Sequence, residues 1–218
     1  MIKAVIFDMD GLLIDSEPKW REAETNVFGR LSVAPSEKDF EDMMGNRIQE
    51  VIAKWHAKHP WDDFSIDKTQ KEIVEEVGRL VVTTAELMPG VSEVLDQLRI
   101  QNSELRIALA SSSPLSLIER ITKHFDIYDR FDVVCSAEFE KNGKPAPDVF
   151  LTAARRLITA PENCLVLEDS YNGVLAAKNA GMKCIAIPAM SQFDDPRFDI
   201  ADVKLRSLLE FSIPDLSI

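Results

Sequence analysis

Short apolar runs alternate with helical hydrophobic patterns along most of this chain. The strand-like runs lie at residues 2–7 and near 106–110, 132–136, 164–167, 183–187 and 203–205. Between the later runs, apolar residues recur at the spacing of an amphipathic helix. This alternation predicts an α/β fold with a doubly wound parallel sheet, in which ligands bind beyond the carboxyl ends of the strands.

The alternation is interrupted once, between Gly11 and Arg106. That stretch is far longer than the roughly dozen residues that a parallel crossover requires. Its apolar residues recur at helical spacing, as over residues 48–55 and 73–81. The predicted division is an inserted all-α domain at residues 16–86 and a core of residues 1–15 and 87–218.

Two carboxylates follow the first strand-like run. Asp8 and Asp10 are two residues apart, so in an extended chain their side chains point to the same side. Two like charges at so short a separation are costly unless a cation lies between them or one carboxyl group keeps its proton. Both arrangements serve catalysis. Taken alone, the pair fits an ordinary turn equally well, because Asp and Gly are common after a strand.

Two serines follow the run at 106–110. Ser111 and Ser112 lie where a strand ends and a helical pattern begins, and unpaired N–H groups at such a junction attract phosphate. The simpler interpretation is that a serine caps the helix, with Pro114 beside its first turn.

A lysine and an acidic pair complete the set of polar strand ends. Lys144 lies between Gly143 and Pro145, in a loop that can present its charge to a phosphate, although most lysines are solvated. Glu168 and Asp169 directly follow the run at residues 164–167. An acidic pair after a buried strand needs a cation, and Mg²⁺ accepts carboxylate ligands.

The overall charge restricts the classes of partner. The chain has 25 basic and 37 acidic residues and a formal net charge of −12, which disfavours binding to nucleic acids and to acidic membrane surfaces. No apolar stretch approaches the roughly twenty residues of a membrane span. We therefore expect a cytoplasmic protein that is soluble, a monomer or a weak dimer.

Taken together, these motifs resemble those of the haloacid dehalogenase superfamily, in the branch whose helical cap is inserted after the first strand. The matching motifs are the aspartate motif Asp8-Met9-Asp10-Gly11, the hydroxyl motif at Ser111, the lysine motif at Lys144 and the acidic motif Glu168-Asp169. They occur in the family's order, and the resemblance covers essentially the whole chain. It implies a phosphohydrolase with a Rossmann-like core and a cap domain.

The resemblance also implies a role for each motif. Asp8 is the expected nucleophile, which forms an aspartyl phosphate, and Asp10 the expected general acid and base. The expected ligands of Mg²⁺ are the Asp8 carboxylate, the Asp10 backbone carbonyl and Asp169. Glu168 is expected to bind the ion directly or through water. Ser111, Ser112 and Lys144 are expected to bind the phosphoryl oxygens.

Longer strings narrow the resemblance to sugar-phosphate phosphatases. The segment Asp195–Leu205 is most similar to the 2-deoxyglucose-6-phosphatase or hexitol phosphatase type, which implies a small phosphorylated sugar or sugar alcohol as substrate. In the inserted domain and its hinge, Glu17, Trp20 and Arg47 are expected to contact that substrate. Trp20 and Arg47 fit structural roles equally well, as a residue of the cap's core and as a surface residue at a helix start.

Three other functions remain open from the sequence. The first is a β-phosphoglucomutase, although such mutases carry a histidine where this chain has Trp20. The second is a metal-independent 2-haloacid dehalogenase, against which Asp10, Glu168 and Asp169 argue. The third is a phosphosugar-binding protein without catalysis, which would be expected to have lost a motif residue.

Overall fold

Six parallel strands form one central sheet in the computed structural model, which describes residues 1–101 and 104–212. The strands are β1 (Ala4–Phe7), β2 (Arg106–Ser111), β3 (Val133–Ser136), β4 (Cys164–Glu168), β5 (Lys183–Ala186) and β6 (Val203–Lys204). Their order is β3-β2-β1-β4-β5-β6. Because the order runs outward in both directions from β1, the prediction of a doubly wound parallel sheet is confirmed.

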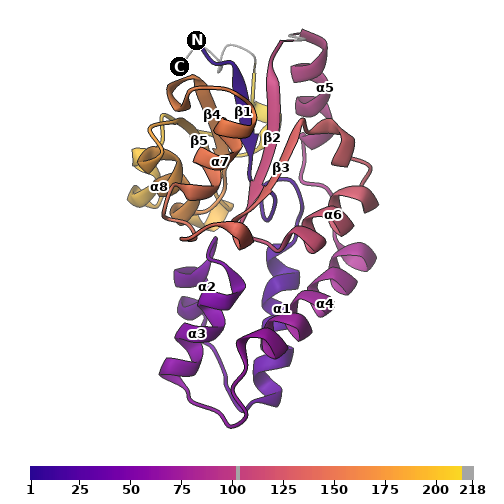
Figure 1. Cartoon of the computed structure of the whole chain (residues 1–218), viewed down its shortest axis with the longest axis vertical. Helices are drawn as coiled ribbons and strands as arrows, with labels where there is room; N and C mark the ends of the chain where they lie inside the picture. The colour runs from indigo at the N-terminus through magenta and orange to yellow at the C-terminus, as the bar shows by residue number, and fades with distance from the viewer. Residues whose placement is uncertain (102–103, 213–218) are drawn as a thin grey trace.

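Helices cover both faces of the sheet (Figure 1). The helices α5 (Val91–Gln101) and α6 (Leu115–His124) pack on one face, and α7 (Asp148–Arg156) and α8 (Tyr171–Asn179) pack on the other. Successive residues of β1 alternate between the two cores: Val5 and Phe7 belong to one, Ala4 and Ile6 to the other. A strand buried on both sides requires a continuous apolar run, which is the pattern seen in the sequence.

Four further helices lie beyond the carboxyl ends of the strands (Figure 1). They are α1 (Glu17–Arg30), α2 (Glu37–Met43), α3 (Ile48–Lys58) and α4 (Ile66–Thr84). Aromatic side chains hold this group together, with Phe28 of α1 stacked on Trp55 of α3 at a centroid distance of 4.6 Å. Within the described residues, no helix is both long and apolar enough to cross a membrane.

The chain leaves and re-enters the sheet region through two adjacent segments. Asp15 N–H donates to the Glu86 carbonyl at 3.0 Å, and Met88 N–H donates to the Leu13 carbonyl at 2.9 Å. Ile14 also pairs with Leu87 as an isolated antiparallel bridge. The helical group α1–α4 is therefore joined to the sheet by two short segments that are hydrogen-bonded to each other.

Candidate active site

The polar strand ends meet at one edge of the sheet. Asp8 directly follows β1, Ser111 ends β2 and Glu168 ends β4. Phe7 is paired with both Leu109 and Leu167, so β1 lies between β2 and β4 in matching register. Three segments that are remote in sequence thus deliver their side chains to the same place, as parallel pairing requires.

A buried lysine lies at the centre of this site. Lys144 Nζ donates to Asp8 Oδ1 at 2.5 Å and to Glu168 Oε1 at 2.6 Å, and contacts the Ala110 carbonyl at 3.4 Å. All three charged side chains are buried. Burial alone lowers the pKa of Lys144, but the two carboxylates outweigh it and leave the pKa above its ordinary value. Lys144 is therefore a permanent positive charge beside Asp8.

Three carboxylates gather around this lysine. Asp8, Glu168 and Asp169 each offer an oxygen atom within 4.8 Å of the other two. Burial raises the pKa of Asp8 to about 8 although Lys144 lowers it, and Glu168 and Asp10 add to the increase. Burial also raises the pKa of Asp169 well above its ordinary value, with Glu168 and Asp8 contributing. The single charge of Lys144 does not balance three carboxylates, so this group of side chains fits a bound divalent cation.

Glu168 is fully occupied by protein donors. Its Oε1 atom accepts from Lys144, and its Oε2 atom accepts from the Ser170 N–H and hydroxyl groups, both at 3.0 Å. Gly173, in the first turn of α8, leaves the space that the carboxylate fills: a Cβ atom there would lie 1.8 Å from Oε1. Asp8 and Asp169 have fewer such bonds, so they are the more available ligands.

Replacing Gly173 by alanine should displace Glu168 and disturb Lys144 through it. We expect the free energy of unfolding to fall by about 1–3 kcal/mol, as for an overpacked core, and kcat to fall at least about tenfold. Urea titration and steady-state assays measure the two effects. Gly29→Ala is the matched control, because a Cβ atom there meets nothing within 4 Å; equal behaviour of the two variants would contradict the prediction.

Asp10 is held by four donors and is separate from the lysine cluster. Its Oδ1 atom accepts from Ser16 Oγ at 2.7 Å and Trp20 Nε1 at 2.9 Å. Its Oδ2 atom accepts from Ser113 Oγ at 2.7 Å and Ser111 Oγ at 3.3 Å. The two carboxylates predicted as a pair therefore have different surroundings, which suits opposite roles.

The predicted phosphate-binding serines also differ in their surroundings. Ser111 Oγ accepts from the Ser113 N–H group at 3.0 Å and lies beside Asp10. Ser112 Oγ donates instead to the Gly45 carbonyl at 2.6 Å, so its hydroxyl joins the sheet region to the helical group. Sequence reasoning singled out neither Ser113 nor Ser16, although Ser113 belongs to the Ser-Ser-Ser-Pro run that marks this strand end.

Arg47 is buried, and its guanidinium group is hydrogen-bonded to the segment at residues 137–141. Its guanidinium group donates to the Ala137 and Glu140 carbonyls at 3.3 and 2.9 Å and pairs with Glu50 at 2.5 Å. It is not among the residues that line the pocket described next. A substrate contact by Arg47, as the sequence predicts, would require the guanidinium group to exchange these partners.

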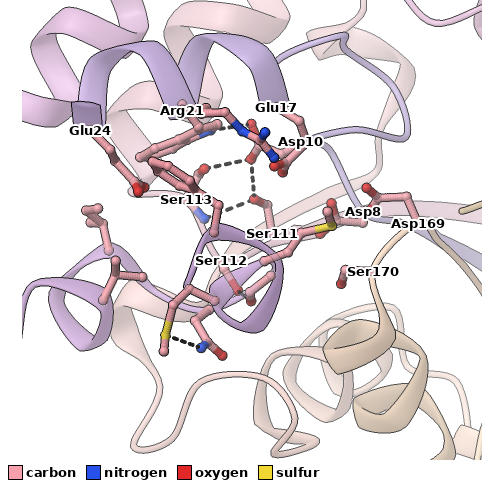
Figure 2. A pocket seen from close by; sticks show the side chains of 18 residues that line it. Asp8, Asp10, Glu17, Arg21, Glu24, Ser111, Ser112, Ser113, Asp169 and Ser170 are labelled. Carbon is pink, nitrogen blue, oxygen red and sulfur yellow. Dashed lines mark hydrogen bonds between the residues drawn. The ribbon is translucent and has the colours of Figure 1, made fainter. Parts of the chain in front are cut away.

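A pocket extends from the carboxylates into the helical group (Figure 2). Asp8, Asp10 and Asp169 line its end at the sheet, together with Ser111 to Ser113 and Ser170. Helix α1 contributes four lining residues, Glu17, Trp20, Arg21 and Glu24. Glu17 and Trp20 were predicted to face the substrate, whereas Arg21 and Glu24 were not singled out. Helical spacing of 3 to 4 residues puts all four on one side of α1.

Comparisons with known proteins agree with this geometry. A model of the haloacid dehalogenase-like hydrolases matches residues 2–181. The chain is 43% identical to hexitol phosphatase B of Escherichia coli over 99% of this chain and 96% of the relative. It is 35% identical to a phosphorylated carbohydrates phosphatase of Thermotoga maritima over 84% of each. CbbY of Rhodobacter sphaeroides, crystallised with phosphate, superposes with a TM-score of 0.88 at 28% identity, covering 100% of both chains.

Proposed function

This chain belongs to the haloacid dehalogenase-like hydrolase family, and we propose that it is a Mg²⁺-dependent phosphatase of a small sugar phosphate or sugar-alcohol phosphate. The observation that carries the proposal is the buried contact of Lys144 with Asp8 and Glu168 at 2.5 and 2.6 Å, beside Asp169. The names of the E. coli and Thermotoga relatives support the substrate class.

The first half of the reaction transfers the phosphoryl group to Asp8. An Asp8 carboxylate oxygen attacks phosphorus, the bond between phosphorus and the ester oxygen breaks, and an aspartyl phosphate forms. Asp10, in its protonated form, gives its proton to the departing oxygen, so the alcohol leaves uncharged. The four hydrogen-bond partners of Asp10 support this role, because they keep its carboxyl group in one orientation and the serine hydroxyls among them can accept the bond that the protonated form donates.

The second half regenerates the enzyme with water. A water molecule attacks the aspartyl phosphate, its proton passes to Asp10, and the bond between phosphorus and the Asp8 oxygen breaks. Lys144 and Ser111 hold the phosphoryl oxygens in both steps, and positioning of this kind supplies most of the acceleration in phosphoryl transfer. Asp8 and Asp169, supported by Glu168, would hold a Mg²⁺ ion, which when bound neutralises charge on the phosphoryl group.

The helical group supplies the rest of the substrate site. In this proposal residues 16–86 form a cap domain over a core of residues 1–15 and 87–218, and the paired segments at Leu13–Asp15 and Glu86–Met88 act as the hinge. The pocket between α1 and the strand ends supports this division. Closure of the cap would keep bulk water from the leaving group.

Phosphate release from a panel of substrates tests the function. Hexose, 2-deoxyhexose, hexitol, pentose and glycerol phosphates should include at least one good substrate, and activity should stop in EDTA and return with added Mg²⁺. β-Glucose 1-phosphate is the control for a mutase. Phosphate release that is unaffected by EDTA, conversion of β-glucose 1-phosphate without hydrolysis, or no release from any substrate would each contradict the proposal.

A further inference from the structure

A buried glutamate lies at the end of the pocket away from Asp8. Glu24 projects from α1 into the pocket, and Figure 2 shows its carboxyl group far from the Asp8 and Asp169 labels. The residue is only 8% exposed. No hydrogen bond joins its carboxyl group to any other described residue. Among the described side chains, every fully buried polar atom has a partner, so the unpartnered Glu24 oxygens are not fully buried. The carboxyl oxygens are therefore open to the pocket.

The pocket is the place where a partner for this carboxyl group can bind. Because the carboxyl oxygens reach the pocket, a molecule bound there can supply the hydrogen bonds that the protein does not. The adjacent cation does not provide the bond, because the Arg21 guanidinium group is paired with Glu37 and lies over the Phe40 ring at 5.1 Å. Glu24 therefore has no hydrogen-bonded partner among the described residues.

The protonation state of Glu24 favours a neutral partner. Burial raises the pKa of Glu24 to about 8, and the nearby Arg21 lowers it only in part. At neutral pH the group is therefore mostly an uncharged carboxylic acid, with one O–H donor and an accepting carbonyl oxygen. A hydroxyl group offers the complementary acceptor and donor.

The rest of the pocket lining favours a carbon chain without a second charge. Phe40, Met43, Ile48 and Val51 line the pocket with apolar surface, suited to C–H groups. Arg21 is the one cation among the lining residues, all of which the structure describes, and Glu37 already neutralises it. A second phosphate or a carboxylate would find no unpaired positive charge here.

We propose that Glu24 determines substrate specificity by hydrogen-bonding a hydroxyl group on the substrate's carbon chain, at the end away from the phosphate. The site then selects uncharged polyol or sugar monophosphates over bisphosphates and phosphorylated sugar acids. This inference rests on the proposed phosphatase function and deepens it, because it names the residue that recognises the leaving group.

Substrate comparison with three variants tests the inference. The measured quantity is kcat/KM for the best polyol or sugar phosphate of the panel and for p-nitrophenyl phosphate, which has no hydroxyl group. Glu24→Leu should lose about 10- to 100-fold on the polyol phosphate, mainly through KM, and this loss should exceed the loss on p-nitrophenyl phosphate at least tenfold. Glu24→Gln, which keeps a donor and an acceptor, should retain activity within about threefold.

Glu22→Leu is the matched control, because Glu22 is an exposed glutamate of the same helix. Glu22→Leu should leave kcat/KM unchanged for both substrates. Equal losses of Glu24→Leu on both substrates, or none on the polyol phosphate, would overturn the inference while leaving the phosphatase function intact. If the wild-type enzyme releases no phosphate from any substrate, the proposed function fails and the inference falls with it.

A second measurement needs no variant. The wild-type enzyme should prefer a hexitol monophosphate over the corresponding 1,6-bisphosphate by at least about tenfold in kcat/KM. A preference for the bisphosphate would overturn the proposed selection, because Glu24 and the paired Arg21 offer a second phosphate no attraction.

Discussion

The Asp8→Asn variant should release no detectable phosphate from any substrate, with kcat at least about 10⁴-fold below that of the wild-type enzyme. An amide does not replace a carboxylate as nucleophile, so no phosphoryl group can be transferred to position 8. The variant also loses one carboxylate of the Lys144 ion pair at 2.5 Å. Because Asn has nearly the same shape, the loss should come from chemistry and not from unfolding.

Two measurements check this result. Mass spectrometry of acid-quenched enzyme should find a phosphoryl group on Asp8 in the wild-type protein and none in the variant. Asp62→Asn, which changes an exposed carboxylate between α3 and α4, should turn over normally. Retained turnover in Asp8→Asn would exclude Asp8 as the nucleophile and, with it, the proposed mechanism.

The Lys144→Met variant should lose both activity and stability. Without the lysine, Asp8 and Glu168 stay buried with no positive partner, and breaking a buried ion pair in this way costs about 3–5 kcal/mol. Turnover should fall at least about 10³-fold, because a preorganised charge on the phosphoryl oxygens is lost.

The stability loss should depend on pH in a definite direction. Removing the lysine should raise the pKa of Asp8 further above its value in the unfolded chain. A carboxyl group whose pKa is raised by folding reduces stability at every pH at which it is ionised in the unfolded chain, and the reduction grows as the pH rises toward the folded pKa. The destabilisation should therefore be largest above pH 8 and should shrink as the pH falls toward 5. Urea titrations at several pH values measure it.

Lys141→Met is the control for this variant. Lys141 is exposed in the same loop, so its replacement should leave the unfolding free energy within about 0.5 kcal/mol of the wild-type value. A Lys144→Met protein as stable and active as this control would show that Lys144 is not the charge that organises the site.

Much of the fold could be predicted from local pattern. The strand-like runs at 106–110 and 164–167 became β2 and β4, because a strand buried on both faces must be continuously apolar. The meeting of Asp8 and Asp169 was foreseen for a related reason: parallel strands place their carboxyl ends at one edge. Lys144 joins them from the loop that follows β3. The roles of these residues in catalysis stay predictions until the variants are measured.

Other features of the site could not be predicted from the sequence. Ser16 and Ser113 are ordinary polar residues in the chain, yet both donate to Asp10 at 2.7 Å. Arg47 was expected to contact the substrate, and that contact stays a prediction; in this structure its guanidinium group bonds Glu50 and backbone carbonyls at residues 137–141. Nothing in the local sequence specifies contacts between segments about ninety residues apart.

The sequence by itself determined the parallel sheet, the inserted helices and the strand ends that carry the polar motifs, since periodicity and strand-end chemistry are local properties of the chain. Only the tertiary structure decided which donors hold Asp10, what Arg47 binds and that Glu24 is buried in the pocket. These features depend on how α1 to α4 pack together and against the sheet edge, and that packing is set by long-range contacts.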